Sequence, residues 1–519
     1  MTVAAARRRD GGRGRFAALA ALAAAVALGG FLGTVAARNP PRTMLQPAAL
    51  AAEAAPAGSA SSSWYCPAAP GPAARAGKTE LLLVNAAPRA VQVDAVIVDA
   101  QGSQRQHELE LGPHAEAGLV PSQVIDGVWL AARILVAGGA VSATELVDGR
   151  TGRSVTPCAS EVASRWYFAS GSTREGSTLR VTLFNPTPNL AVVDLSFVTA
   201  SGSTNPAPFQ GVVVAPWDLR VLTVGAYVQN QASIATAVTA RSGAVVAGEL
   251  QLYGPDGAGG VAFELGAPAM STLSDLPAVE DATGGSSELV VFNPSARSER
   301  VDVAVRLPSG PVHPFTQVLG PKSAWTLPTS EQIRIALEER YTVQVRAFGP
   351  GVVVARVGAG TPHGPAPWWA QDVTVTGAQA SAARSWMVVA PPAVPRAAAA
   401  TSSAATSSTA TSSAATSSTA TSSTATSSAA TSSTAHPSLA SWRIVLENPR
   451  RGPLRVEVTS WAGARRHAQV VQVPAFGEAT AVVPAGPAFV RADAAVAVMG
   501  DASPSGSVGV VGIPAVPLR

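Results

Sequence analysis

A repeated strand pattern is clearest in residues 179–202, which read LRVTLFNPTPNLAVVDLSFVTASG. Asn185-Pro186 marks the turn out of the first strand, because an Asn side chain can bond its own backbone and Pro cannot continue a strand ladder. After the turn, apolar and polar residues alternate around Asp194, and this period of two places the acid on the outer face. The stretch therefore predicts a pair of strands joined by a turn.

The same pattern occurs four times in the chain. The other copies read LLLVNAAPRAVQVDAVIVDAQG from Leu81, ELVVFNPSARSERVDVAVRLPSG from Glu288 and WRIVLENPRRGPLRVEVTSWAG from Trp442. They align on Asn85, Asn185, Asn293 and Asn448, and nine residues after each Asn stands an acid: Asp94, Asp194, Asp302 and Glu457. Seventeen residues after the first three stand Gly102, Gly202 and Gly310, whereas Gly463 comes two positions early. Four matches at a fixed offset indicate an internal repeat.

Further short apolar runs follow each pair of strands, as in residues 211–215 and 219–224. Six or seven short strands per hundred residues, broken by Gly and Pro, predict an all-β protein of tandem Ig-like antiparallel β-sandwich repeats. We expect these sandwiches to follow one another like beads. Four repeats could also close into a four-bladed β-propeller, which is the alternative fold.

The fourth repeat contains a long insertion. Trp64 precedes Asn85 by 21 residues, whereas Trp386 precedes Asn448 by 62. Between the latter two lie 39 residues of only Ala, Ser and Thr, 397–435, and without them the spacing is 23. This tract has too few large apolar groups to bury, so we expect it to be disordered, either as a plain loop or as a site of O-glycosylation.

The N-terminus carries the signals of export. Residues 1–15 hold five Arg and one Asp, which equals the whole net charge of +4, and the uncharged residues 16–37 would span about 33 Å as a helix. Because the remainder is neutral on balance, nucleic acid is excluded as an expected partner. We expect a single-pass plasma-membrane protein with its C-terminal part outside the cytoplasm, or a secreted protein if the segment is a cleaved signal peptide.

The expected parts follow from these features. They are a cytoplasmic basic tail (1–15), a transmembrane helix or signal peptide (16–37), a linker (38–62) and β repeats at 63–160, 161–270, 271–380 and 381–519. Cys66 and Cys158 are the two cysteines of the chain, and in an exported protein they predict one disulfide that brackets the first repeat.

Two resemblances support this architecture. Trp166-Tyr167-Phe168-Ala169-Ser170-Gly171, followed by the Asn185 turn, resembles a β-repeat of exported bacterial proteins that opens on a Trp-Tyr-Phe-Ala-Glu-Gly-type segment, although Ser170 replaces the Glu. The N-terminal segment followed by Trp64-Tyr65-Cys66-Pro67 resembles an uncharacterised family of single-pass envelope proteins of high-GC Gram-positive bacteria. That family implies location and architecture, and no chemistry.

The sequence offers few residues for chemistry. It contains no HExxH, GxSxG or nucleotide-binding glycine motif, so we expect no enzyme, no catalytic residue, no metal and no cofactor. The aligned acids are expected to be outward strand polarity rather than a cation site, because one acid per repeat does not converge. Trp217 and Trp325 are expected in the core. Trp368 and Trp369 are either packing residues or candidates for stacking on a sugar ring.

The sequence is consistent with two functions. The first is a non-enzymatic, membrane-anchored envelope protein, attached through residues 16–37, that scaffolds or binds other envelope components. The alternative is a carbohydrate-binding or accessory protein of cell-wall glycan assembly, with cell-wall glycan as the partner.

Overall fold

The structure of the protein is a computed structural model. It describes residues 52–71, 74, 77–149, 153–254, 260–279, 286–307, 309–335, 341–359, 373–377, 383–388, 441–462, 465–484, 486–501, 512–514 and 516–517. The chain divides into two units, residues 1–47 and 48–519, and the described residues all belong to the second. The predicted tail (1–15), the segment 16–37 and the tract 397–435 lie outside the described residues. Within the described part, no helix has the length and apolarity needed to cross a membrane.

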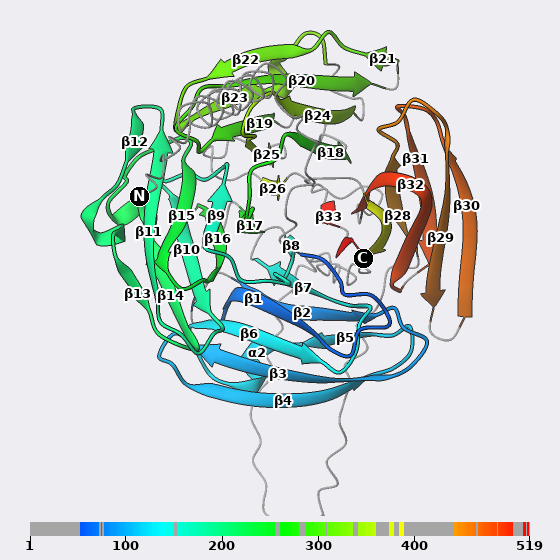
Figure 1. The fold of residues 1–519 in the computed structure, drawn as a ribbon, viewed down its shortest axis with the longest axis horizontal. Coiled ribbons are helices and arrows are strands. Elements are labelled where there is room, and N and C mark those ends of the chain that lie inside the picture. The colour runs from blue at the N-terminus through cyan, green and yellow to red at the C-terminus, as the bar shows by residue number, and fades with distance from the viewer. Residues whose placement is uncertain are drawn as a thin grey trace, which may run out of the picture. The chain divides into compact units, whose positions relative to one another are not determined.

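The first repeat is a sandwich of two antiparallel four-stranded sheets (Figure 1). One sheet has the order β1-β6-β3-β4 and the other β5-β2-β7-β8. The strands are β1 (Ser62–Pro70), β2 (Lys78–Asn85), β3 (Val91–Asp99), β4 (Gln104–Leu111), β5 (Glu116–Leu119), β6 (Trp129–Val136), β7 (Val141–Asp148) and β8 (Arg153–Pro157), with one short helix, α2 (Pro121–Val124). This is one strand more than the six or seven expected, because β4 has almost no buried residue and therefore no apolar run to reveal it.

The second and third repeats have the same two-sheet order. In the second, β9-β15-β11-β12 faces β14-β10-β16-β17, and in the third, β18-β24-β20-β21 faces β23-β19-β25-β26. The second has β9 (Arg165–Phe168), β10 (Ser177–Asn185), β11 (Ala191–Thr199), β12 (Gly202–Thr204), η2 (Ala207–Phe209), β13 (Val212–Val214), β14 (Asp218–Thr223), η3 (Val224–Ala226), β15 (Ala235–Ser242), β16 (Val246–Tyr253) and β17 (Gly260–Leu265). The third has β18 (Leu273–Val279), β19 (Ser286–Asn293), β20 (Glu299–Leu307), β21 (Gly310–Pro311), β22 (Phe315–Leu319), β23 (Ser323–Pro328), η5 (Thr329–Glu331), β24 (Tyr341–Ala347), β25 (Val353–Ala359) and β26 (Val373–Gly377).

The fourth repeat differs in one respect: a single long strand, β32, belongs to both of its layers. The first part of β32 pairs with β27 and β29, and its last part pairs with β28 and β33. The strands are β27 (Ala383–Val388), β28 (Ser441–Glu447), β29 (Leu454–Ala462), β30 (Arg465–Val473), β31 (Glu478–Pro484), β32 (Ala488–Asp501), β33 (Gly512–Pro514) and β34 (Val516–Pro517). The first three repeats are thus sandwiches of two separate sheets, and the fourth has two layers that share β32. None of them is the single four-stranded sheet of a propeller blade, so the propeller alternative is wrong.

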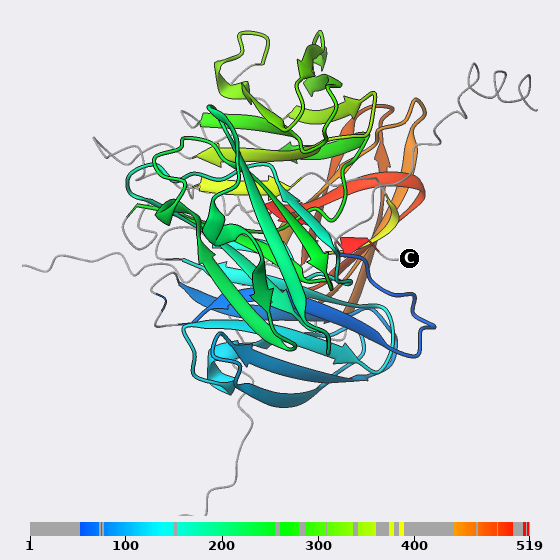
Figure 2. The same ribbon diagram turned by 60° about the vertical axis from the view of Figure 1, so that its left-hand side comes forward.

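The sandwich cores come from the alternation that the sequence predicts. In β3, Val93, Ala95 and Ile97 are buried whereas Asp94 is half-buried on the other face. Figure 2 shows the paired layers from a second direction. The glycines that close the following turn, Gly102, Gly202 and Gly310, all have positive φ, and a Cβ added at any of them would meet no other atom within 4 Å. The repeated Gly therefore serves backbone conformation and not close packing.

The aligned Asn residues join two turns in every repeat. All four are fully buried at 0% exposure. In the second repeat, Asn185 Oδ1 accepts a hydrogen bond from the N–H of Thr187, and its Nδ2 donates to the carbonyls of Asn189, Val214 and Ala215. Asn85 and Asn448 make the same set of contacts, and Asn293 bonds both turns as well. The prediction that this Asn bonds its own backbone is confirmed, and the second turn is an addition from the tertiary structure.

Replacing Asn185 with Ala should lower the free energy of unfolding by about 3 kcal/mol, because the buried carbonyls in two turns lose their donor. Urea unfolding measures the change. The matched control is Asn189→Ala, since the exposed Asn189 side chain has no hydrogen-bond partner among the described residues. Equal losses for the two variants would contradict the structural role assigned to Asn185.

Apolar contacts join neighbouring repeats. Val98 and Ala131 of the first repeat pack with Phe184 and Leu219 of the second. Tyr167 and Val198 of the second pack with Phe292 and Val353 of the third. The core of the fourth repeat includes four residues of the first: Leu82, Val84, Leu146 and Val155. These interfaces bury apolar side chains from both partners, so the repeats stabilise one another.

One strand near the C-terminal end of each repeat contacts the corresponding strands of the two neighbouring repeats. β8 contacts β17, β17 contacts β26, β26 contacts β33, and β33 contacts β8. Between β8 and β17, the hydroxyls of Ser154 and Thr156 both donate to the carbonyl of Phe263, and the N–H of Phe263 donates to Ser154 Oγ. These contacts run from the first repeat through the second and third to the fourth, and from the fourth back to the first. The expectation that the repeats follow one another like independent beads was therefore wrong.

Candidate functional site

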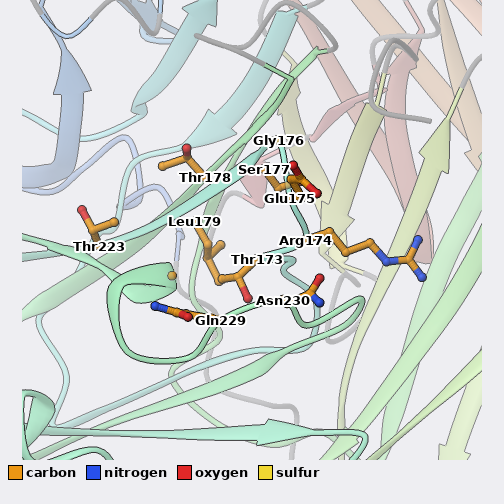
Figure 3. A pocket seen from close by; sticks show the side chains of 11 residues that line it. Thr173, Arg174, Glu175, Gly176, Ser177, Thr178, Leu179, Thr223, Gln229 and Asn230 are labelled. Atoms are coloured by element: carbon orange, nitrogen blue, oxygen red, sulfur yellow. The ribbon is translucent and has the colours of Figure 1, made fainter. Parts of the chain in front are cut away.

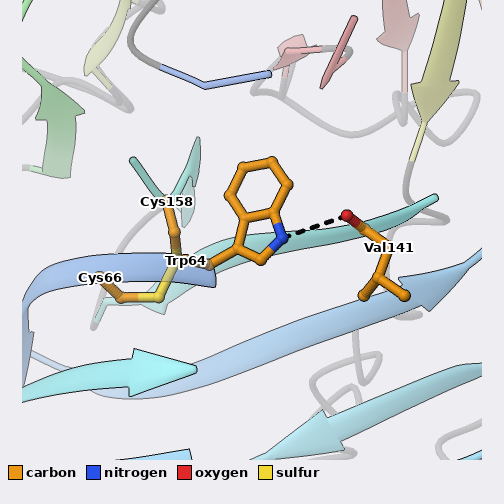
Figure 4. The surroundings of a disulfide bond; sticks show 4 residues. All are labelled: Trp64, Cys66, Val141 and Cys158. Carbon is orange, nitrogen blue, oxygen red and sulfur yellow. Dashed lines mark hydrogen bonds between the residues drawn. A yellow bond between two sulfur atoms is a disulfide. The ribbon is translucent and has the colours of Figure 1, made fainter. Parts of the chain in front are cut away.

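The predicted disulfide forms between Cys66 and Cys158, with an S–S distance of 2.03 Å (Figure 4). Cys66 lies on β1, and Cys158 directly follows β8, so the bond joins the first and last strands of the first repeat. Beside it, the buried indole N–H of Trp64 donates to the carbonyl of Val141 at 3.1 Å. Trp166 makes the equivalent bond to Val245 in the second repeat, at 2.8 Å. The two Trp residues are thus core residues that anchor the opening strand.

A carboxyl group lies next to the disulfide. The carboxyl of Glu145 and the two cysteine sulfurs lie within 4.8 Å of one another. Because the sulfurs are bonded to each other, neither is a thiolate, and the group is not a metal-ligand set in this state. Burial raises the pKa of Glu145 to about 8, so the group is a neutral carboxylic acid at pH 7.

Two further acids face each other inside the second repeat. Glu249 on β16 stands directly opposite Glu264 on β17, and both are buried. Burial raises the pKa of Glu264 to about 8, and burial together with the nearby Glu264 charge raises that of Glu249 well above its ordinary value. Glu447 in the fourth repeat is a similar case, with a pKa raised by burial to about 8. Sequence reasoning missed all of these acids; the one available signal was a Glu at an inward position of an apolar strand.

The aligned acids lie apart and have partners on neighbouring strands. Asp194 accepts hydrogen bonds from Arg241 and from the N–H of Gly211; burial alone would raise its pKa, but these bonds lower it. Asp302 accepts a bond from Thr316 at 2.9 Å, and Glu457 pairs with Arg466 at 3.4 Å. The side chains of Asp194, Asp302 and Glu457 are 24%, 28% and 47% exposed. Outward strand polarity is confirmed for these three.

The structure tests the roles predicted for two of the four tryptophans. Trp368 and Trp369 lie outside the described residues. Trp217 is half-buried and not in a core: the guanidinium of Arg133 from the first repeat lies 4.6 Å from its ring centroid. The core expectation was wrong because Trp217, at φ +58°, sits in a turn between strands. Trp325 is partly buried against the core of the third repeat.

A polar groove lies at one end of the second repeat. It has a volume of about 480 Å³ and is lined by residues 173–179 from the start of β10 and the segment before it, and by Thr223, Gly225, Gln229 and Asn230 around η3 (Figure 3). Four of the lining residues carry hydroxyls, two carry amides, and Leu179 supplies the one large apolar side chain. Arg174 and Glu175 give the lining no net charge.

Hydrogen bonds between backbone segments hold the two walls together. Thr173 N–H donates to Gln231, Asn230 N–H donates to Thr173, and Ile234 N–H donates to Gly171. The side chain of Thr173 adds two bonds, donating to the carbonyl of Val228 and accepting from Gln231 N–H. Gln251 braces the first wall, since its amide accepts from Ser172 N–H and donates to the carbonyl of Thr178. The groove is therefore preformed by the fold.

Comparisons with known proteins give a family and little else. Among curated proteins none matches this chain. The crystal structure of Thermotoga maritima 1070 is 13% identical, with 21% of this chain and 91% of that chain covered and a TM-score of 0.18. A tetra-tandem repeat in the extending region of a large adhesion protein is 12% identical, with 85% of this chain and 96% of that chain covered and a TM-score of 0.10. Neither likeness carries an argument. A model of a family of unknown function, DUF5719, matches residues 131–440, more than half of the chain, and the chain therefore belongs to this family.

Proposed function

We propose that this protein is a non-enzymatic, membrane-anchored envelope protein of a high-GC Gram-positive bacterium, whose β repeats lie outside the cytoplasm and bind other envelope components. The observation that carries the proposal is the disulfide. Cys66 and Cys158 are 1% and 0% exposed and join the two ends of a repeat, which is how exported domains use such bonds. The basic residues 1–15 and the uncharged residues 16–37 supply the orientation signal and the anchor.

The packing of the repeats supports an interaction role. Apolar clusters join first to second, second to third and fourth to first repeat, so the sandwiches hold fixed positions at these contacts instead of swinging on linkers. A stiff body keeps its outward strands at constant spacing, and this preorganisation lowers the entropic cost of binding an extended partner.

The acids of the chain also fit a role without catalysis. Glu145 and Glu264 are enclosed in sandwich cores and hold their protons at neutral pH, so neither is placed to meet a substrate. Asp194 and Asp302 are occupied by neighbouring side chains.

Fractionation of cells that express the full chain tests the proposal. We expect the protein in the membrane fraction, degraded by protease added to intact spheroplasts, and without thiols that react with an alkylating agent under denaturing, non-reducing conditions. A variant without residues 16–37 should stay in the cytoplasm with both cysteines alkylatable. Full-length protein found in the cytosol with two free thiols would overturn the proposal, and release into the medium would favour the secreted form.

A further inference from the structure

We propose that the groove lined by residues 173–179 and by Thr223, Gly225, Gln229 and Asn230 binds a neutral saccharide. The inference rests on the proposed envelope role and specifies the class of ligand that the protein would bind there. The observations that support it come from the groove in the second repeat.

Several side chains of the groove have unused hydrogen-bonding capacity. The side chains of Thr178, Thr223, Gln229 and Asn230 line the groove, and within the described residues none of them has a protein hydrogen-bond partner (Figure 3). Hydroxyls donate and accept, and amides do both through separate atoms. This mixed set matches the hydroxyl groups of a sugar, each of which also donates and accepts.

The lining disfavours both charged and apolar ligands. A phosphate or polyanionic ligand calls for an excess of cations, and the lining has one Arg and one Glu. An apolar ligand or side chain calls for apolar walls, and Leu179 is the one large apolar lining residue. A neutral polyhydroxylated ligand requires neither an excess of cations nor apolar walls, so it fits this lining.

The groove is also preorganised. The groove walls are tied by the backbone bonds of Thr173 and braced by Gln251, so a ligand does not have to order them. The volume of about 480 Å³ lies within the usual range of small-molecule sites, roughly 300–1,000 Å³.

Gly225 offers a way to fill the groove without straining the fold. Its φ is not positive, and a Cβ added there would lie 3.5 Å from Cγ2 of Thr173, an ordinary contact. A larger side chain at this position can therefore extend into the groove. The variant Gly225→Leu blocks the site by volume. The triple variant Thr178→Val, Thr223→Val and Gln229→Ala removes the side-chain donors and acceptors available to a sugar, and it keeps similar shapes at the two Thr positions.

The experiment uses the full chain in detergent and five probes: maltotriose, mannotriose, galactotriose, arabinotriose and chitotriose. Saturation-transfer NMR and calorimetry report binding. We expect at least one sugar to bind, and the triple variant to weaken its affinity at least about tenfold. Gly225→Leu should abolish binding. The matched control, Ser203→Ala with Asn205→Ala, removes an exposed hydroxyl and an exposed amide elsewhere in the second repeat and should bind like the wild type.

Two results would overturn the proposal: no binding of any probe at millimolar concentration, or binding that survives both groove variants. Thermal unfolding of each variant shows whether it is folded. If the triple variant unfolds, magnetisation transfer from the wild-type Thr178 and Thr223 methyl groups to the bound sugar decides the matter. Because these measurements need no cell or membrane, their failure is separate from a failure of the envelope localisation.

Discussion

Replacing both Cys66 and Cys158 with Ala should lower the free energy of unfolding of the first repeat by about 4–5 kcal/mol. The cysteines are 92 positions apart, so the bond closes a long loop and lowers the conformational entropy of the unfolded chain. Ala keeps the site apolar, and both cysteines are buried, so the change isolates the cross-link from new polar groups. Loss of this size is a large part of the stability of an ordinary domain.

Urea unfolding with hydrogen–deuterium exchange resolved by peptide measures this effect. Exchange should accelerate most in β1 and in β8, because the bond joins β1 to the residue after β8. It should accelerate less in the third repeat, which has no strand in the bridged loop. Wild-type protein in reductant is the control and should match the double variant. A loss below about 1 kcal/mol would mean that contacts with neighbouring repeats already restrict this loop in the denatured state.

The second large effect is a pH dependence set by Glu145. Its pKa is raised from 4.5 to about 8, so the unfolded chain ionises first and binds fewer protons than the folded one above pH 4.5. The stability contribution of the group is fully present below pH 4.5 and declines by about 1.4 kcal/mol per pH unit until about pH 8. Between pH 5 and pH 7.5 this amounts to about 3 kcal/mol for the one carboxyl.

Glu145→Gln should remove this share of the slope, because the amide does not ionise. Urea midpoints of wild type and variant, measured from pH 5 to pH 8, should therefore diverge, with the variant gaining on the wild type as the pH rises. The slope of unfolding free energy against pH should fall by the contribution of one carboxyl group. It should not vanish, because Glu264 and Glu447 also have raised pKa values. Glu108→Gln on the exposed strand β4 is the matched control and should run parallel to the wild type. Parallel curves for Glu145→Gln would show that water reaches this carboxyl.

Local patterns carried the prediction of the repeat fold. The alternation around Asp94, Asp194 and Asp302 and the turn at each aligned Asn depend on residues close in sequence, so they could be found without coordinates. The turn Gly residues belong to the same class, because positive φ is a local requirement. The disulfide was predictable for another reason, since two cysteines in a chain that is expected to be exported leave one pairing.

The candidate site was not predictable in this way. The groove brings residues 173–179 next to residues 223–230, and neither segment has a motif that marks a ligand site. The buried acids were hidden as well: Glu249 and Glu264 are far enough apart in sequence that only the β16–β17 register places them opposite each other. The sequence pointed to Trp368 and Trp369 instead, because paired aromatics are conspicuous in a sequence.

The sequence by itself determined the unit of this protein: a four-fold β repeat, its sandwich cores, its Asn-bonded turns and its one disulfide, all consequences of short-range periodicity and composition. Only the tertiary structure decided how the units meet. The fourth repeat packs on the first through Leu82, Val84 and Leu146, residues that read as ordinary strand positions. Such contacts depend on the complementary shapes of surfaces whose residues lie hundreds of positions apart. The alternation within a strand does not specify which of these surfaces pack together.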